Sequence, residues 1–177
     1  MKLKLFVVGF LILSGAGTTA DLFACGAKFL MASRGTRFGK VAVARHPAAV
    51  LVYANPSSVL PEALGKVKVE EVLGRAGYRP TTVSSAAELQ TALQKGGWDL
   101  VVADLADGET LRAQLQGEDA PVFLPVMFKP SRDDFKQAEE DFGLVVKGPV
   151  KSQRFLETVD EVVTLLVAHR AESQPAA

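Results

Sequence analysis

The chain has 177 residues, with 20 basic and 20 acidic side chains, a hydrophobic content of 48% and one cysteine. This length fits a single domain with its own core and argues against a multidomain enzyme. The balanced charge lacks the basic surface that a nucleic-acid backbone requires, so no nucleic-acid partner is expected. One cysteine permits neither an internal disulfide nor a four-thiolate metal site.

The first twenty residues have the pattern of a bacterial secretory signal. Lys2 and Lys4 precede an apolar block at residues 5–13, and small residues suited to cleavage follow it. The uncharged stretch is shorter than the about 18 to 20 apolar residues that a spanning helix needs. We therefore expect a signal peptide at residues 1–20 that is cleaved, and a mature protein that is periplasmic or secreted. A membrane contact is expected only if the signal stays uncleaved or a lipid is attached.

The segment at residues 21–47 precedes the domain. Cys25 follows Leu-Phe-Ala at residues 22–24, a sequence similar to the box before the lipid-modified cysteine of bacterial lipoproteins. Two interpretations stay open, a lipidated Cys25 after cleavage directly before it, or a free thiol that packs as a small apolar group. The segment is too apolar for a free linker, so we expect an N-terminal extension that packs on the domain as extended strand; its apolar residues include Phe29, Leu30, Met31 and Phe38.

Short apolar runs alternate with helix-patterned stretches through residues 48–168. The expected strands are 49–53, 81–83, 100–103, 121–127 and 144–146, and the expected helices are 59–76, 86–95, 109–115, 131–141 and 152–168. Continuous apolar runs between helices predict a doubly wound, mostly parallel α/β sheet. Pro125 interrupts the fourth run and predicts a strand that is short, bulged or near an edge. The small polar residues at 169–177 predict a flexible tail.

Three segments of the sequence resemble the receiver domain of response regulators. Residues 98–105, Trp-Asp-Leu-Val-Val-Ala-Asp-Leu, look like its third strand and phosphoacceptor loop, with Asp104 in the acceptor position. Residues 120–124 look like the start of its fourth strand. Lys147-Gly148-Pro149 is similar to its phosphate-pairing Lys-Pro, with Gly148 inserted. The resemblance implies a flavodoxin-like, five-stranded sheet of order 2-1-3-4-5 with a site at the carboxyl edge.

The same alignment replaces the residues that make a receiver reactive. Ala54 and Asn55 stand where receivers carry the acidic pair that holds Mg²⁺, and no Ser or Thr ends the fourth strand. One aspartate beside an amide makes a poor Mg²⁺ site. We therefore expect a degenerate pseudo-receiver without a metal, a cofactor or catalytic residues. Asp104 would be an inactive acceptor paired with Lys147, and the exposure of that pair would make Asp104→Asn nearly neutral for folding.

These observations favour a non-catalytic interaction module exported to the bacterial envelope. The receiver resemblance implies that its protein partner binds the face formed by residues 131–142 and 152–168. One alternative is a phosphorylatable receiver that accepts phosphate at Asp104 and keeps its N-terminal segment. A remote alternative is a small secreted hydrolase, although no nucleophile motif of a known hydrolase class is present in the sequence.

Overall fold

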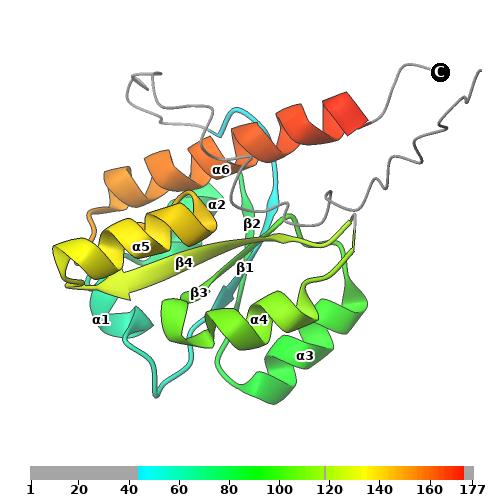
Figure 1. Cartoon of the computed structure of the whole chain (residues 1–177). Coiled ribbons are helices and arrows are strands. Elements are labelled where there is room, and N and C mark those ends of the chain that lie inside the picture. Colours follow the sequence, from blue (N-terminus) through cyan, green and yellow to red (C-terminus); the bar gives the residue numbers. More distant parts are fainter. Residues whose placement is uncertain (1–43, 118, 174–177) are drawn as a thin grey trace, which may run out of the picture.

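The computed structural model describes residues 44–117 and 119–173 (Figure 1). Five parallel strands form one sheet in the order β2-β1-β3-β4-β5. The strands are β1 (Ala49–Tyr53), β2 (Arg79–Val83), β3 (Leu100–Asp104), β4 (Val122–Phe128) and β5 (Val146–Gly148). The predicted α/β fold with flavodoxin-like strand order is confirmed. The expected signal at residues 1–20, Cys25 and the extension as far as residue 43 lie outside the described residues.

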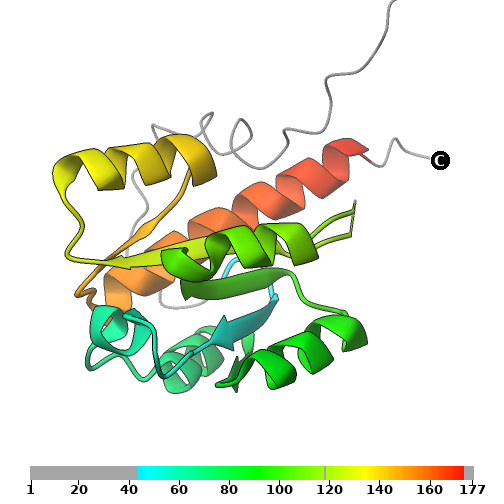
Figure 2. The same ribbon diagram turned by 60° about the horizontal axis from the view of Figure 1, so that its bottom comes forward.

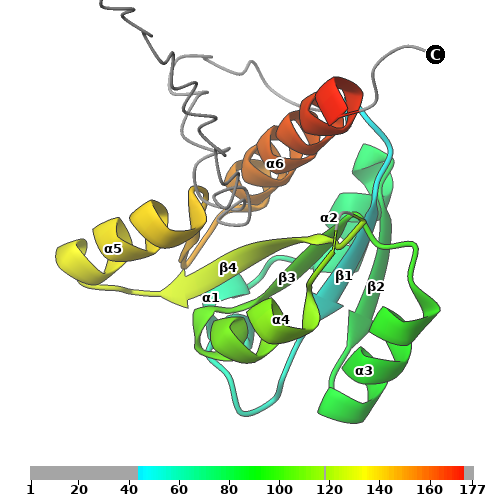
Figure 3. The ribbon, with the colours of Figure 1, turned by 45° about the vertical axis from the view of Figure 1, so that its right-hand side comes forward.

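Helices cover both faces of the sheet, as Figure 3 shows. Alternate residues of a strand point to opposite faces, so Val50 and Val52 face one core while Leu51 and Tyr53 face the other. The first core is covered by α1 (Leu60–Leu64), α2 (Val69–Ala76) and α6 (Ser152–Ser173), and the second by α3 (Ala86–Lys95) and α4 (Gly108–Gln114). Each face of the central strands is therefore buried, which accounts for their continuous apolar sequence.

The remaining helix, α5 (Arg132–Phe142), lies beside β4 on the face of the sheet that α3 and α4 cover, at the edge away from α3 (Figure 2). Ser131 caps it by accepting a hydrogen bond from the Asp134 N–H. Phe142 meets Phe123 edge to face, with ring centroids 5.5 Å apart. Ala138 is the only fully buried residue of α5, so this helix is attached to the sheet by a narrow strip.

The expected helix at 59–76 is two helices, which corrects the prediction. Gly65 has a φ of +57°, a conformation that glycine adopts without a steric penalty, and it ends α1 after Leu64. A short link then leads to α2, which ends at Gly77 in the left-handed conformation. The apolar spacing matched one long helix because both helices present their apolar residues to the same core.

Pro125 lies within β4, which has seven residues and is the longest strand of the sheet. The strand is therefore not short, and of the expected alternatives only a position near the sheet edge fits. Alternate backbone amides of a strand face alternate neighbours, and the Val122 N–H bonds toward β3 while the Lys129 N–H bonds toward β5. The nitrogen of Pro125 faces the β5 side, but β5 begins only opposite Val126. The missing N–H therefore removes no hydrogen bond of the sheet.

Pro80 has a comparable position in the edge strand β2. The Arg79 N–H donates to Ala48 O and the Val83 carbonyl accepts from Ala54 N, so odd-numbered residues of β2 bond to β1. The nitrogen of Pro80 therefore faces outward, away from the sheet. A proline there costs no internal hydrogen bond and removes a donor from an edge that another strand could otherwise join.

The last two elements differ from the prediction in their limits. β5 occupies Val146–Gly148 rather than residues 144–146, and α6 continues to Ser173, so residues 169–173 are helical rather than part of a tail. Gly148 is where β5 meets α1. A β-carbon on Gly148 would lie 2.6 Å from the Cα and the carbonyl oxygen of Ala63. The glycine inserted between Lys147 and Pro149 is thus required by the close approach of two backbones.

Candidate functional site

Asp104 ends β3 at the carboxyl edge of the sheet, where the sequence places it. Its side chain is buried, with 5% of the residue exposed. One carboxylate oxygen accepts a hydrogen bond from the Val59 N–H at 2.8 Å, and the other accepts one from the Ala106 N–H at 3.0 Å. Asp104 therefore caps its own turn and also fixes the loop that leads into α1.

Lys147 does not pair with Asp104. Successive side chains of β5 alternate, so Val146 and Gly148 are buried while Lys147 is exposed. The Lys147 ammonium lies 5.0 Å from the ring centroid of Phe135 on α5, a cation–π contact. The described residues contain no ion pair between Lys147 and Asp104. The sequence predicts that Asp104→Asn is nearly neutral for folding because it predicts an exposed ion pair with Lys147. Asp104 instead accepts hydrogen bonds from two backbone amides.

The two positions that match the acidic pair of receivers have structural contacts. Ala54 packs against the first core, and its N–H donates to Val83 O at 2.8 Å. The side-chain oxygen of Asn55 accepts a hydrogen bond from the Ser57 N–H at 3.0 Å, which closes an Asx turn. The Asn55 carbonyl accepts from both the N–H and the hydroxyl of Ser58. Asn55 thus shapes the loop between β1 and α1.

Asp107 is a carboxylate of this edge that the sequence reasoning did not single out. It ends a 3₁₀ turn (Leu105–Asp107) and is half-buried, and one of its oxygens has no hydrogen-bond partner among the described residues. Burial and then the charge of Asp104 raise the pKa of Asp107, while a hydrogen bond with the Asn55 side chain opposes that rise. Burial and the nearby Asp107 also raise the pKa of Tyr53. This edge therefore gathers two carboxylates and one amide.

The chemistry open to this edge follows from how its oxygens are used. Both oxygens of Asp104 are occupied by backbone donors, whereas Asp107 retains one buried oxygen that gains from protonation. Within residues 44–117 and 119–173, no three His, Cys, Asp or Glu side chains are grouped so as to hold a metal ion. The expectation of weak Mg²⁺ affinity stays a prediction.

No helix in the described part of the chain has the length and apolarity needed to cross a bilayer.

An open groove of about 350 Å³ separates α5 from the ends of β3 and β4. Its apolar surface comes from Leu105, Met127 and Phe142, and its acidic rim comes from Asp134 and Asp141. Both rim carboxylates bond only to neighbours on or beside their own helix, Asp134 to the Ser131 hydroxyl and Asp141 to the Gln137 amide. Neither is in an ion pair within the described residues. The groove is part of the face that the sequence assigned to a partner.

Comparison with models of known protein families and with curated proteins gives no match for this chain.

Asp160 is a second acidic residue that the sequence reasoning missed. It lies on α6, 1% exposed, and accepts hydrogen bonds from the Arg45 N–H at 3.0 Å and the Tyr78 hydroxyl at 3.1 Å. The Arg45 Nε lies 3.4 Å from its second oxygen. Burial, followed by the charge of Asp160, raises the pKa of Tyr78 far above its usual range. The sequence signal that could have revealed Asp160 is the presence of an acidic residue within the apolar stripe of a helix.

Proposed function

We propose that this chain is a receiver-like interaction module of the bacterial envelope that acts through its surface and not through phosphorylation. The observation that carries the proposal is the state of Asp104, whose two oxygens are both bound by backbone amides in a buried position. A phosphoacceptor needs an accessible carboxylate oxygen, and phosphorylation here would first require the loop before α1 to release it. The structural contacts of Ala54 and Asn55 agree with a site kept for folding.

The partner surface in this proposal is centred on α5 and its groove. The helix carries five acidic and two basic side chains, and the only ion pair within it joins Lys136 to Glu140. An acidic rim around an apolar floor favours a protein segment with an apolar anchor between basic side chains. The exposed side of α6, which includes Val167, extends the same proposed face.

The interaction is tested by comparing what charge variants retain from an envelope extract. We expect a specific partner to be retained by the unmodified protein and lost by the Asp134→Lys/Asp141→Lys variant. Glu70→Lys, an exposed acidic position in the first turn of α2, is the matched control and should retain it. Equal retention by all three proteins, or no specific partner for any, would contradict this interface.

The absence of phosphorylation chemistry is tested separately. We expect no aspartyl phosphate after incubation with acetyl phosphate and Mg²⁺, measured by the mass of the intact protein. Stoichiometric, Mg²⁺-dependent labelling that Asp104→Asn abolishes would instead establish a phosphorylatable receiver.

Export is tested by sequencing the N-terminus of the protein recovered from the envelope fraction. We expect that protein to begin near residue 21 or at a lipidated Cys25. An intact Met1 on protein from the cytoplasm would contradict export.

A further inference from the structure

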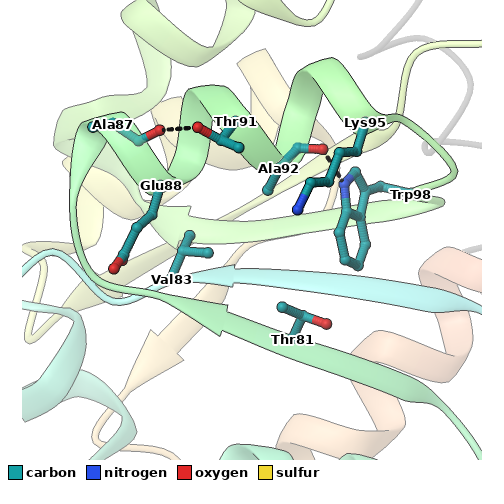
Figure 4. A pocket seen from close by; sticks show the side chains of 8 residues that line it. All are labelled: Thr81, Val83, Ala87, Glu88, Thr91, Ala92, Lys95 and Trp98. Carbon is teal, nitrogen blue, oxygen red and sulfur yellow. Dashed lines mark hydrogen bonds between the residues drawn. The ribbon is translucent and has the colours of Figure 1, made fainter.

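A second groove lies between the edge strand β2 and helix α3, away from α5. It is open to solvent and has a volume of about 570 Å³, within the range of small-molecule sites. Thr81 and Val83 of β2 form its floor, and the side chains of Ala87, Glu88, Thr91, Ala92 and Lys95 form its wall (Figure 4). Trp98, in the loop after α3, closes one end.

The groove exists because α3 packs over the central strands and leaves part of β2, around Thr81, exposed. Leu89 and Ala92 are buried in the second core with Leu51 and Val101 of the central strands. Thr81 pairs with Leu51 and lies on the same face of the sheet, yet it remains exposed. The exposure of this part of β2 therefore follows from the position of α3 on the sheet.

Trp98 provides a fixed aromatic surface. Its indole N–H donates to the Ala92 carbonyl at 2.7 Å, which holds the half-buried ring in one orientation against α3. Because that hydrogen bond already uses the polar edge of the indole, what remains for a ligand is the ring itself. A rigid aromatic ring offers a large contact area at a low entropic cost.

Of the two charged side chains of the groove, Glu88 and Lys95, only Glu88 has a hydrogen-bond partner within the described residues. Glu88 accepts hydrogen bonds through one carboxylate oxygen from the Ser84 N–H, the Ser84 hydroxyl and the Ser85 N–H, which hold its side chain at the start of α3. Lys95 has no ion pair or hydrogen bond within the described residues, and Thr81 has no hydrogen-bond partner for its hydroxyl there. Figure 4 shows Lys95 and Trp98 together at one end of the groove and Glu88 at the other.

We propose that this groove binds a small organic anion that carries a flat aromatic ring, such as an aromatic carboxylate. The ring packs against the Trp98 indole, and the anionic group pairs with the Lys95 ammonium while accepting a hydrogen bond from Thr81. Glu88, seven residues earlier and about 10 Å along the helix, disfavours a second anionic group at the far end. The site is distinct from the proposed partner surface on α5 and does not depend on it.

The test uses the single tryptophan of the chain, which gives one indole N–H resonance in a ¹⁵N spectrum. The probe is 2-naphthoate, titrated into the full chain, with 2-naphthamide as the neutral compound of the same shape. We expect a saturable shift of the Trp98 indole resonance with a Kd below about 1 mM for the anion. The amide should bind more weakly, by up to about fivefold, because it lacks the ion pair.

Variants then assign the charge. Lys95→Met should weaken 2-naphthoate binding about fivefold and leave 2-naphthamide binding unchanged. Lys66→Met, which removes an exposed lysine between α1 and α2, is the matched control and should have no effect. No saturable shift at millimolar naphthoate, equal binding of acid and amide, or an Lys95→Met variant that binds like the unmodified protein would each overturn the proposal.

Discussion

Replacing Gly148 with alanine should destabilise the fold strongly, although the change adds only one methyl group. The added β-carbon would lie 2.6 Å from the Cα and carbonyl oxygen of Ala63 and 2.7 Å from its β-carbon. These are mostly backbone atoms, so no rotamer change can relieve the contact, and α1 must move away from β5. Overpacking of this kind costs about 1 to 3 kcal/mol.

The same movement weakens a second contact between these segments. The Val150 N–H donates to the Ala63 carbonyl at 3.1 Å, and that bond lengthens if α1 retreats. A lost backbone hydrogen bond adds about 0.5 to 1.5 kcal/mol. Gly148→Ala should therefore lower the free energy of unfolding by about 2 to 4 kcal/mol.

Urea unfolding followed by Trp98 fluorescence and by far-ultraviolet circular dichroism measures this loss. Gly74→Ala is the control, because Gly74 lies within α2 and a β-carbon there meets nothing within 4 Å. That variant should be stabilised by about 0.5 to 1 kcal/mol through helix propensity. A Gly148→Ala protein whose stability matches that of the unmodified chain would refute the close approach of β5 to α1.

Three further predictions concern the buried carboxylates. Because the pKa of Asp107 is raised, the folded state binds the Asp107 proton more tightly than the unfolded chain does. The free energy of unfolding therefore falls as the pH rises from the ordinary pKa of 3.8 through the raised pKa of the folded state. Asp107→Asn should thus be more stable than the unmodified protein at pH 7 and lose that advantage below pH 3.8, as urea midpoints across pH would show; a pH-independent difference would contradict this. Asp160→Ala should cost about 2 to 3 kcal/mol, and a double-mutant cycle with Tyr78→Phe should give a coupling of about 1 kcal/mol; additive effects would rule out the buried contact. Asp104→Asn should cost about 1 to 2 kcal/mol, since one backbone amide loses its acceptor, and a neutral effect would favour the exposed pairing expected from the sequence.

Much of the architecture was predictable because local signals agreed with the fold. The apolar runs gave all five strands, and Ser85 with Glu88 marked the start of α3, where the structure has the complete capping box. The split at Gly65 was missed because apolar spacing does not report the sign of φ. For Pro125 the sequence left three alternatives open, of which the position near the edge fits, because the cost of a proline depends on which neighbour its nitrogen faces.

The candidate site was predictable only in part. The end of β3 placed Asp104 at the carboxyl edge, but which donors surround a carboxylate depends on loops that the sequence pattern does not specify. Lys147 was assigned to Asp104 because both follow strands, whereas the alternation along β5 directs it to Phe135. Asp107 and Asp160 were missed because burial of an acidic residue depends on distant partners. Tyr78 is 82 residues from Asp160 in the sequence.

The position of Asp160 has a consequence for the order in which the chain folds during synthesis. Its carboxylate joins Arg45 across 115 residues, so the beginning of the domain is bonded to a residue near its end. Until α6 leaves the ribosome, the first core lacks the apolar side chains of that helix, and the Tyr78 hydroxyl lacks its acceptor Asp160. Contacts of such long sequence separation form late. We therefore expect a nascent chain that stops before residue 152 to leave the first core partly exposed to solvent.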